Sequence, residues 1–538
     1  MKRPEIRQCT HSARQRLRPV YVLVMVALFL LWPMPRSVQA SVGDLDPSFG
    51  VGGKVITSFP GDQSGANAIA IQSDGKIVLG GFAGPYPFVD FTLARYNSDG
   101  SLDATFGNGG RVTTDFYGDI DAINAVAIQP DGKIVAAGTA RIPGSAATHF
   151  AIARYNKDGS LDSEFGSAGK VVDSYSGIAV RAIGIQLDGT IVAAGTINNE
   201  RGIVIVRYDT DGNPGANVIA FTGNLNGWAS AYGVAFQKDK KIIIAGSAPE
   251  PQGYSRFAVL RYNTDLSLDL TFGSGGIAYG EFPSGYSRTS RAFAVVVQSD
   301  NKIVAAGVCL GTSADWQLDF AIARFLEDGG HDPSFGSNGE VTTDFWGSDE
   351  QARSLALQPD GKIVVAGCVN GASPDYAVAR YNSDGRLDSA FGSGGMTTTD
   401  FLGSYNVGNA VAVQADGRIV VAGSDLARES NFTMARYEGD TAFDTCLQDD
   451  ANGSWLWFNS TTGVYRFTSC SGATLSGTGV VARKASLITL QDYRSDRRIQ
   501  AQVDTVIKKG SASAQLFSSS STIFLADRNT SNSTCSCH

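Results

Sequence analysis

Carboxylates spaced around glycine are the side chains of this chain with the clearest potential for chemistry. The stretches "NSDGSLD" (Asn97–Asp103) and "DTDGN" (Asp209–Asn213) place Asp oxygens at intervals that could surround calcium, which takes six to eight oxygen ligands. No glutamate follows at the spacing of an EF-hand. Asp, Asn and Gly in this order are also typical of tight turns. We therefore expect turns and no cofactor, with calcium as the less favoured alternative.

Patterns of catalytic residues are sparse. After residue 40 the histidines are His149, His331 and His538, and no "GxSxG" or "HExxH" motif occurs. Acidic residues crowd several loops, so a carboxylate pair that cleaves a polysaccharide stays open as an alternative. We assign no catalytic residue and favour a protein that is not an enzyme.

Seven arginines lie in apolar segments, where an unpaired charge would be costly. Aspartates recur at matching intervals in "QxDG" and "LDxxFG" stretches, so we expect Arg–carboxylate pairs that join turns or repeat units. A basic ligand pocket formed by these arginines is the alternative. The arginines are Arg95, Arg154, Arg207, Arg261, Arg324, Arg380 and Arg436.

Six cysteines follow residue 40. Cys309 and Cys368 end equivalent segments of adjacent repeat units, so we expect free, buried thiols there. The other four fall within about 100 residues at the C-terminal end, a density that predicts disulfides in an exported protein. We expect Cys446 and Cys470 to be bridged and leave the partners of Cys535 and Cys537 open, with "CSCH" as a metal site the alternative.

The first 40 residues have the layout of a secretory signal peptide. Six Lys and Arg precede the apolar run Val20–Trp32, and "SVQA" then offers small residues for cleavage before Ser41. Thirteen apolar residues are fewer than the roughly 20 that a membrane span requires. We expect secretion to the periplasm, the cell surface or the medium, with an uncleaved membrane anchor as the alternative.

The charge of the remaining chain excludes one class of partner. Residues 1–40 hold seven Lys/Arg and one Asp/Glu, so their removal leaves 37 basic and 51 acidic side chains and a formal charge of −14. Without a basic cluster, such a chain would be repelled by nucleic acid. We expect an unknown protein or glycan partner, no membrane span after cleavage, and a monomer.

Three sequence elements recur in step along the chain. "QxDGKIV" and its variants return seven times, 51 to 61 residues apart, with "ARYNxDG" and "LDxxFGxxGKV" between them. In the second unit, residues 122–129, 133–140, 150–156 and 169–175 each read as a strand, with a "DG" hairpin between the first two. Four antiparallel strands per unit predict one blade of a β-propeller. The repeated glutamines are Gln72, Gln129, Gln186, Gln237, Gln298, Gln358 and Gln414.

The two ends of the repeat array predict a closed ring. The array begins at Leu45 with a fourth strand and ends near residue 440 with a third strand. Pairing of residues 51–59 with residues 432–437 would complete the seventh blade and remove an open sheet edge. We therefore predict an all-β protein with a seven-bladed propeller over residues 45–440. A small disulfide-containing β-domain should follow over residues 441–538, with hairpins at 454–470 and 511–528.

These elements resemble the delta-60 repeat family of secreted bacterial proteins, over residues 45–440. The resemblance implies a β-propeller and export, and it implies no activity. The chain departs from the family pattern in an eroded fourth "LDxxFG" copy, in His331 at a leucine position, and in "KDKK" (residues 238–241) at a "DG" turn.

The loops that vary between units indicate where a ligand would bind. Turns of the "DGK" and "NxDGxLD" kinds should emerge on one face of the ring, and the variable loops on the other. Tyr, Trp and acidic residues in variable loops should reach solvent near the mouth of the central channel, where rigid scaffolds commonly bind partners. We predict an exported, non-enzymatic binding scaffold, with a polysaccharide hydrolase or lyase as the alternative. The candidate ligand-binding residues are Tyr117, Trp228, Trp316, Trp346, Tyr405, Asp115, Asp344 and Asp400; other acids predicted to be solvent-accessible in the same loops include Asp121 and Glu350.

Overall fold

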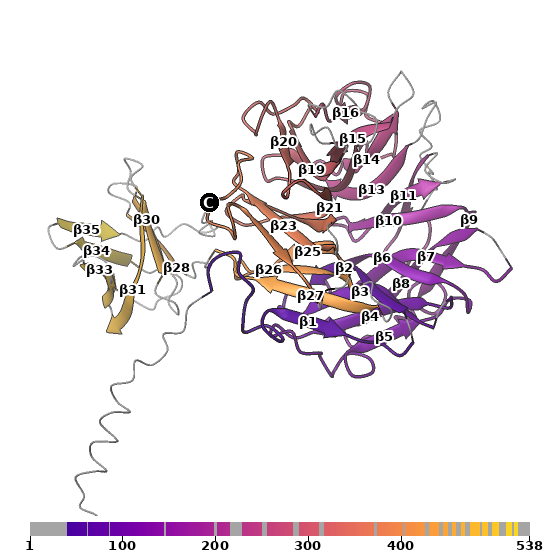
Figure 1. Ribbon diagram of the computed structural model, residues 1–538, viewed down its shortest axis with the longest axis horizontal. Coiled ribbons are helices and arrows are strands. Elements are labelled where there is room, and N and C mark those ends of the chain that lie inside the picture. The colour runs from indigo at the N-terminus through magenta and orange to yellow at the C-terminus, as the bar shows by residue number, and fades with distance from the viewer. Residues whose placement is uncertain are drawn as a thin grey trace, which may run out of the picture. The chain divides into compact units, whose positions relative to one another are not determined.

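Seven antiparallel sheets follow one another along residues 54–437 and surround a common centre (Figure 1). The computed structural model describes residues 40–440, except for 62, 86, 145–146, 198–201, 216–228, 250–254, 283–289, 311–316, 371–373, 402, 404 and 426–429. Beyond residue 440 it describes the backbone of eight strands. The sheets confirm the predicted seven-bladed β-propeller.

Each of the seven sheets is one blade, numbered in chain order. Blade 1 contains β2 (Gln63–Ile71), β3 (Ile77–Gly84), β4 (Asp90–Tyr96) and β5 (Arg111–Thr114). Blade 2 contains β6 (Asp121–Ile128), β7 (Ile134–Arg141), β8 (Thr148–Tyr155) and β9 (Lys170–Ser176). In blade 3 the described strands are β10 (Ile178–Ile185), β11 (Ile191–Ile197) and β12 (Ile203–Tyr208). Blade 4 contains β13 (Ser230–Phe236), β14 (Ile242–Pro249), β15 (Ser255–Tyr262) and β16 (Ile277–Tyr279).

The remaining blades repeat the same order. Blade 5 contains β17 (Arg291–Val297), β18 (Ile303–Leu310), β19 (Leu318–Phe325) and β20 (Glu340–Thr343). Blade 6 contains β21 (Asp349–Leu357), β22 (Ile363–Asn370), β23 (Asp375–Tyr381) and β24 (Met396–Thr399). Blade 7 contains β25 (Asn406–Val413), β26 (Ile419–Asp425) and β27 (Asn431–Tyr437), and its fourth strand is β1 (Lys54–Thr57).

The N-terminal strand closes the ring, as predicted. Lys54 pairs with Ala435 and Thr57 pairs with Phe432, so β1 completes the sheet of β25, β26 and β27. This pairing gives β27 a partner on each side and leaves no blade open at the junction.

Both faces of each blade are buried because each blade packs between two others. All eight residues of β14 and all seven of β11 are buried, as expected for a sheet covered on both sides. One apolar cluster joins Ile77 and Leu79 of blade 1 to Val420 and Met434 of blade 7. The core is therefore a series of apolar layers between blades.

The repeated turns need a residue with positive φ, and in most copies that residue is Gly. In the first turn the Gln72 amide donates to the carbonyl of Lys76, and Gly75 has a φ of 83°. The "KDKK" copy keeps this turn, because Lys240 adopts a φ of 66°. The departure from the family pattern therefore costs local strain and leaves the fold unchanged.

Six of the seven strand arginines confirm the predicted ion pairs. Each lies 2.6–2.8 Å from the aspartate of its "LDxxFG" element, in the pairs Arg95–Asp103, Arg154–Asp162, Arg261–Asp269, Arg324–Asp332, Arg380–Asp388 and Arg436–Asp46. Arg95 also donates to the carbonyl of Lys157 in the next blade, and Arg324 donates to that of Ser383. The arginines thus join each turn to its neighbour around the ring.

Arg207 in the eroded unit is the exception. Gly215 stands eight residues after it, where the other units place the aspartate. In the described part of the chain no carboxylate forms an ion pair with Arg207, and its Nε has no hydrogen-bond acceptor. Burial lowers the pKa of this guanidinium.

Cys309 and Cys368 are buried free thiols, as predicted. The side chains of Cys446, Cys470, Cys535 and Cys537 lie outside the described residues.

Eight strands after residue 440 pair consecutively in one antiparallel sheet. They are β28 (Thr445–Asp449), β29 (Ser454–Phe458), β30 (Val464–Thr468), β31 (Thr474–Lys484), β32 (Leu487–Asp492), β33 (Arg498–Asp504), β34 (Ser513–Ser518) and β35 (Ser521–Leu525). Residues 1–39, which hold the predicted signal peptide, lie outside the described part. Among the described residues, no helix has the length and apolar character needed to cross a membrane.

Candidate ligand-binding face

The strand order separates two faces of the propeller. Within a blade, the turns from first to second and from third to fourth strand emerge on one side, which we call the constant face. The connections from second to third strand, and from each fourth strand to the next blade, emerge on the other side, which we call the variable face. Asp115 and Tyr117 follow β5, Asp344 and Trp346 follow β20, and Asp400 and Tyr405 follow β24. These six candidates therefore share the variable face, whereas Trp228 and Trp316 lie outside the described residues.

A "DFxG" turn has the same geometry at residues 115–118 and at residues 344–347. Oδ1 of Asp115 accepts a hydrogen bond from the Gly118 amide, and Oδ1 of Asp344 accepts one from Gly347, each at 2.5 Å. The Phe between them is held against the blade, as Phe345 packs on Phe320 with ring centroids 5.0 Å apart.

The residue after this Phe projects outward. Trp346 has a φ of 65° and is 65% exposed, and Tyr117 is 43% exposed. Tyr405 is also exposed. Because Phe fills the apolar site at the blade end, these rings stay available to a partner.

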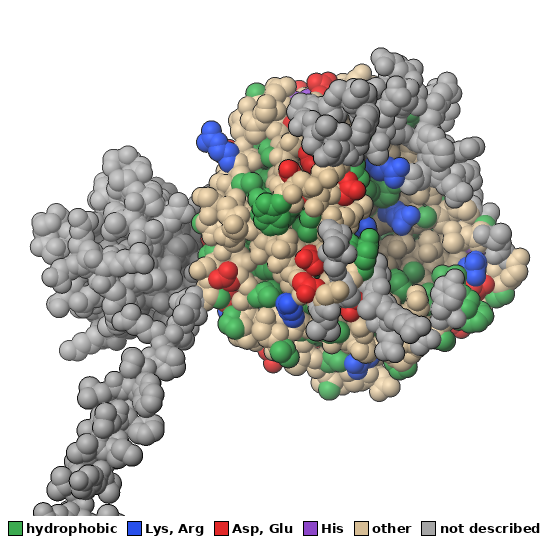
Figure 2. Space-filling model, viewed as in Figure 1, with side chains coloured by type: hydrophobic (Ala, Val, Ile, Leu, Met, Phe, Trp, Pro, Cys, Tyr) green, Lys and Arg blue, Asp and Glu red, His purple; other side chains and the backbone are tan. Residues whose placement is uncertain are grey.

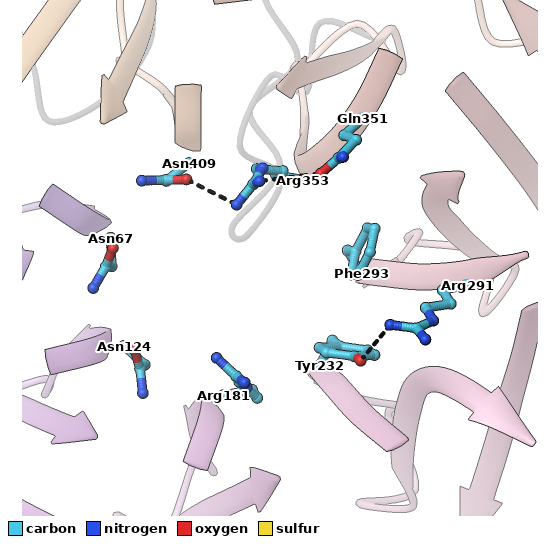
Figure 3. Close-up of a pocket in the computed structure, with 9 residues that line it drawn as sticks. All are labelled: Asn67, Asn124, Arg181, Tyr232, Arg291, Phe293, Gln351, Arg353 and Asn409. Carbon is cyan, nitrogen blue, oxygen red and sulfur yellow. Dashed lines mark hydrogen bonds between the residues drawn. The ribbon is translucent and has the colours of Figure 1, made fainter. Parts of the chain in front are cut away.

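The central channel is lined by the innermost strand of each blade. In each of these strands the register shifts at one residue, a β-bulge that turns a side chain toward the centre. The shifts flank Asn67, Asn124, Arg181, Tyr232, Phe293, Arg353 and Asn409. With Arg291 and Gln351 they line a cavity of about 350 Å³ (Figure 3). We call these nine residues the channel ring.

Three asparagines of the channel ring have a structural role. Asn409, Asn67 and Asn124 each donate to a backbone carbonyl of the next blade, at Ala66, Ile123 and Val180 respectively. The distances are 2.9, 2.8 and 2.8 Å. These bonds hold blades 7, 1, 2 and 3 together at the channel wall.

The other side of the ring carries arginines and aromatic side chains instead. Arg291 donates to the Tyr232 hydroxyl at 3.4 Å, and the Tyr232 ring meets Phe293 edge-on at 5.0 Å. Arg353 donates to Asn409 at 3.3 Å and to Gln351 at 3.1 Å. Arg181 is exposed in the channel. None of the nine ring residues is acidic, so the three guanidinium groups form a locally cationic wall.

This wall opens toward the variable face. Each innermost strand begins at that face, and Arg291 and Gln351 are the first and third residues of β17 and β21. Figure 2 shows basic side chains beside a hollow on this side of the propeller. None of the eight predicted residues belongs to the channel ring.

A sequence signal for the channel ring exists and was missed. Each bulge residue stands five positions before the conserved Gln of its unit, as Asn67 does before Gln72. Across the seven units this position reads Asn, Asn, Arg, Tyr, Phe, Arg and Asn. It varies within a strand that is otherwise small and apolar.

Two groups of three carboxylates lie between blades behind the variable face. Asp90, Asp115 and Asp121 form the first, and Asp319, Asp344 and Glu350 form the second. In each group the carboxylate oxygens lie within 4.8 Å of one another. The prediction that Asp121 and Glu350 reach solvent is wrong, because both are completely buried.

Burial and mutual repulsion raise the pKa values in both groups. Burial, followed by Asp344 and Asp319, raises the pKa of Glu350 to about 8. Burial raises that of Asp319 to about 6 and that of Asp121 to about 7. Asp121 accepts hydrogen bonds from the Phe116 and Arg141 amides, at 2.8 and 3.3 Å.

Comparison with known proteins supports a β-propeller repeat family. Seven segments match a model described as a domain of unknown function (DUF5122) beta-propeller: residues 72–106, 129–165, 186–214, 237–272, 298–335, 358–391 and 414–445. Among curated proteins, none matches the chain.

Several solved structures are similar to part of this chain at low sequence identity. Virginiamycin B lyase from Staphylococcus aureus has 10% identity and a TM-score of 0.41, over 71% of this chain and 98% of that one. A PL25 ulvan lyase has 12% identity and a TM-score of 0.41, over 75% and 95%. Drosophila Plexin A, solved with Semaphorin 1b, has 10% identity and a TM-score of 0.40, over 74% and 87%.

Proposed function

We propose that this protein is an exported, non-enzymatic binding scaffold that captures an acidic glycan on its variable face, at the mouth of the central channel. The observation that carries the proposal is the asymmetry of the channel ring. At three of the seven bulges an Asn side chain donates a hydrogen bond to the next blade. The other four bulges hold Arg181, Arg353, Tyr232 and Phe293. A scaffold position would repeat in every blade, but a binding site requires distinct groups.

The charge of the cavity favours an anionic ligand. Three arginines face it without an acidic residue among the lining side chains, although the chain as a whole is acidic. Guanidinium groups bind carboxylates and sulfates through paired, charge-assisted hydrogen bonds. Low-dielectric walls concentrate the field of such a cleft on an entering anion.

The surrounding aromatic side chains favour sugar rings. Tyr117, Trp346 and Tyr405 are exposed on the same face, and Tyr232 and Phe293 line the channel. Flat apolar rings beside convergent polar groups suit a carbohydrate better than an extended protein surface. The signal-peptide pattern of residues 1–40 and the resemblance of the repeats to the delta-60 family support export.

Binding to a glycan array tests this proposal. Oligosaccharides that carry uronate or sulfate groups should be retained, and neutral sugars of equal length should not. Trp346→Ala or Tyr117→Ala should weaken binding by about 1–2 kcal/mol if the ring contacts the ligand. Lys76→Ala and Lys133→Ala on the constant face are the matched controls and should leave affinity unchanged. The opposite pattern would place the site on the constant face.

A polysaccharide lyase is the second candidate, favoured by the contact between Tyr232 and Arg291. In such a reaction Arg291 would neutralise a uronate carboxylate and stabilise the ionised Tyr232 oxygen, which would remove the proton on the adjacent carbon. Electrons from that C–H bond would form a C=C bond as the bond from the ring carbon to the glycosidic oxygen breaks, and the Tyr232 hydroxyl would return its proton to the departing oxygen. Incubation with uronate polysaccharides should then give unsaturated products that Tyr232→Phe abolishes. Binding without such products favours the scaffold.

A further inference from the structure

Three acidic side chains from separate elements converge between blades 5 and 6. Asp319 is the second residue of β19, Asp344 directly follows β20, and Glu350 is the second residue of β21. The Leu318 amide donates to Asp349 Oδ1 at 2.9 Å and holds the start of β19 against β21. One carboxylate oxygen from each of the three acids lies within 4.8 Å of the others.

Glu350 lacks the contacts that a buried carboxylate needs. It is 0% exposed, and neither of its oxygens accepts a hydrogen bond of normal geometry, although the Phe345 and Ser348 amides lie close enough to lower its pKa. Within the part of the chain that the structure describes, no Lys, Arg or His forms an ion pair with any of the three acids. A buried acceptor without a partner is costly, and two nearby carboxylates increase the cost.

The next junction shows how the chain satisfies the same position without an acid. Between blades 6 and 7, Asn406 replaces Glu350, and its Nδ2 donates to Asp400 at 3.3 Å. There an amide hydrogen supplies the positive partner that Asp400 needs. At the junction of blades 5 and 6, Glu350 offers a further negative group instead.

We propose that Asp319, Asp344 and Glu350 bind a divalent cation, and that calcium fits best. Calcium–oxygen distances of about 2.3–2.6 Å place opposite ligands up to roughly 5 Å apart, which matches the spacing of this group. Three oxygen ligands without nitrogen or sulfur disfavour zinc, and magnesium requires shorter, regular octahedral contacts. Water and backbone carbonyls would complete the coordination.

The cation would fix the turn that carries Trp346. Asp344 begins this turn and accepts from the Gly347 amide, so a bound ion would hold the exposed ring in place. The corresponding group of Asp90, Asp115 and Asp121 should bind more weakly, because the Phe116 and Arg141 amides form hydrogen bonds of normal geometry to Asp121, whereas the Glu350 oxygens accept none. The cation site does not depend on the proposed glycan site.

Terbium luminescence and thermal unfolding of the full chain test the site. Terbium, which occupies calcium sites, should emit when Trp346 is excited, and calcium should displace it with an affinity of about 0.1–1 mM, as in extracellular modules. Calcium should also raise Tm, because it binds only the folded chain. Glu350→Gln should weaken calcium at least tenfold, and Asp400→Asn at the neighbouring junction should leave it unchanged.

Two results would overturn the assignment. One is a wild-type protein with neither sensitised emission nor a calcium-dependent Tm, up to about 10 mM calcium. The other is a Glu350→Gln protein with unchanged affinity. If Glu350→Gln does not fold, the calcium affinity of the Asp344→Asn variant is measured instead. Weaker binding supports the site, and unchanged binding contradicts it.

Discussion

Arg436 Nη2 lies 2.6 Å from Asp46 Oδ2, although 390 residues separate the two side chains. Both are almost completely buried, and Arg436 also donates to the Ser98 carbonyl in blade 1. The same pair forms inside a single unit elsewhere, as with Arg95 and Asp103. The contact therefore completes the seventh repeat with residues from both ends of the propeller.

Removal of Asp46 should destabilise this closure strongly. Asp46→Ala leaves Arg436 buried without its carboxylate, and breaking a buried pair in this way costs about 3–5 kcal/mol. The midpoint of urea unfolding measures the loss. Asp74→Ala is the control, because Asp74 is a solvent-accessible turn residue, and it should have little effect.

Deletion of residues 41–60 extends the test from one contact to the whole strand. Without β1, the edge of β27 is exposed and the ring opens, so the shortened protein should aggregate or unfold. A stable monomer after this deletion would contradict closure by the N-terminal strand.

Arg207 allows the reverse experiment, in which a missing pair is restored. Among the described residues, Cβ of a side chain at Gly215 would meet no atom closer than 3.9 Å. The Gly215 amide donates to the Arg207 carbonyl at 3.1 Å, as the Asp162 amide does to that of Arg154. Gly215→Asp should therefore place a carboxylate on Arg207. We expect a gain of about 1–3 kcal/mol from the charged hydrogen bond.

The control for this gain is Gly215→Ala. This substitution reduces the conformational entropy of the unfolded chain to a similar extent but adds no charge. Urea unfolding of both variants separates the two effects. Equal midpoints for Gly215→Asp and Gly215→Ala would show that Arg207 does not accept the new partner.

The propeller could be predicted from the sequence because the same turn and strand motifs recur in every repeat unit. Seven copies of "QxDG" or its variants and seven strand arginines fix the turns, the blade number and the closure, and even "KDKK" changes none of them. The channel ring was not predicted, because variation at the fifth residue before each repeated Gln does not by itself show that a bulge turns that residue inward. The burial of Glu350 was missed for a related reason: a loop acid was assumed to face solvent, but the adjacent blade covers it.

Stability should depend on pH through Glu350 when calcium is removed. Its pKa is raised to about 8 in the fold, against 4.5 in the unfolded chain, and Asp319 shifts the same way to about 6. The folded state therefore holds protons that the unfolded state has released. The stability that this provides is complete below pH 4.5 and is lost as pH rises through about 8.

Thermal unfolding in a chelator between pH 5 and 9 checks this dependence. The Tm should fall across the interval, and Glu350→Gln should flatten the fall because its side chain does not ionise. A profile with the same slope in both proteins would contradict the burial of an ionisable group at this position.

The cysteines after residue 440 give a prediction about the C-terminal strands. We expect a disulfide between Cys446 and Cys470, which would close a loop of 24 residues and stabilise it by about 3 kcal/mol. Peptide mapping without reduction should recover the two cysteines in one linked fragment. Recovery of both as free thiols would reject the pairing.

The affinity of the channel for an acidic oligosaccharide tests the central claim most directly. Arg181 and Arg353 should each contribute about 1.5–3 kcal/mol through charged hydrogen bonds, so the Arg181→Gln/Arg353→Gln double variant should bind about a hundredfold more weakly or worse by calorimetry. Arg386→Gln is the matched control, because Arg386 is a well-exposed arginine on the constant face. Near wild-type affinity in that control, with the loss confined to the channel variant, is the result expected. Equal affinity in all three proteins would contradict an anion-binding site in the channel.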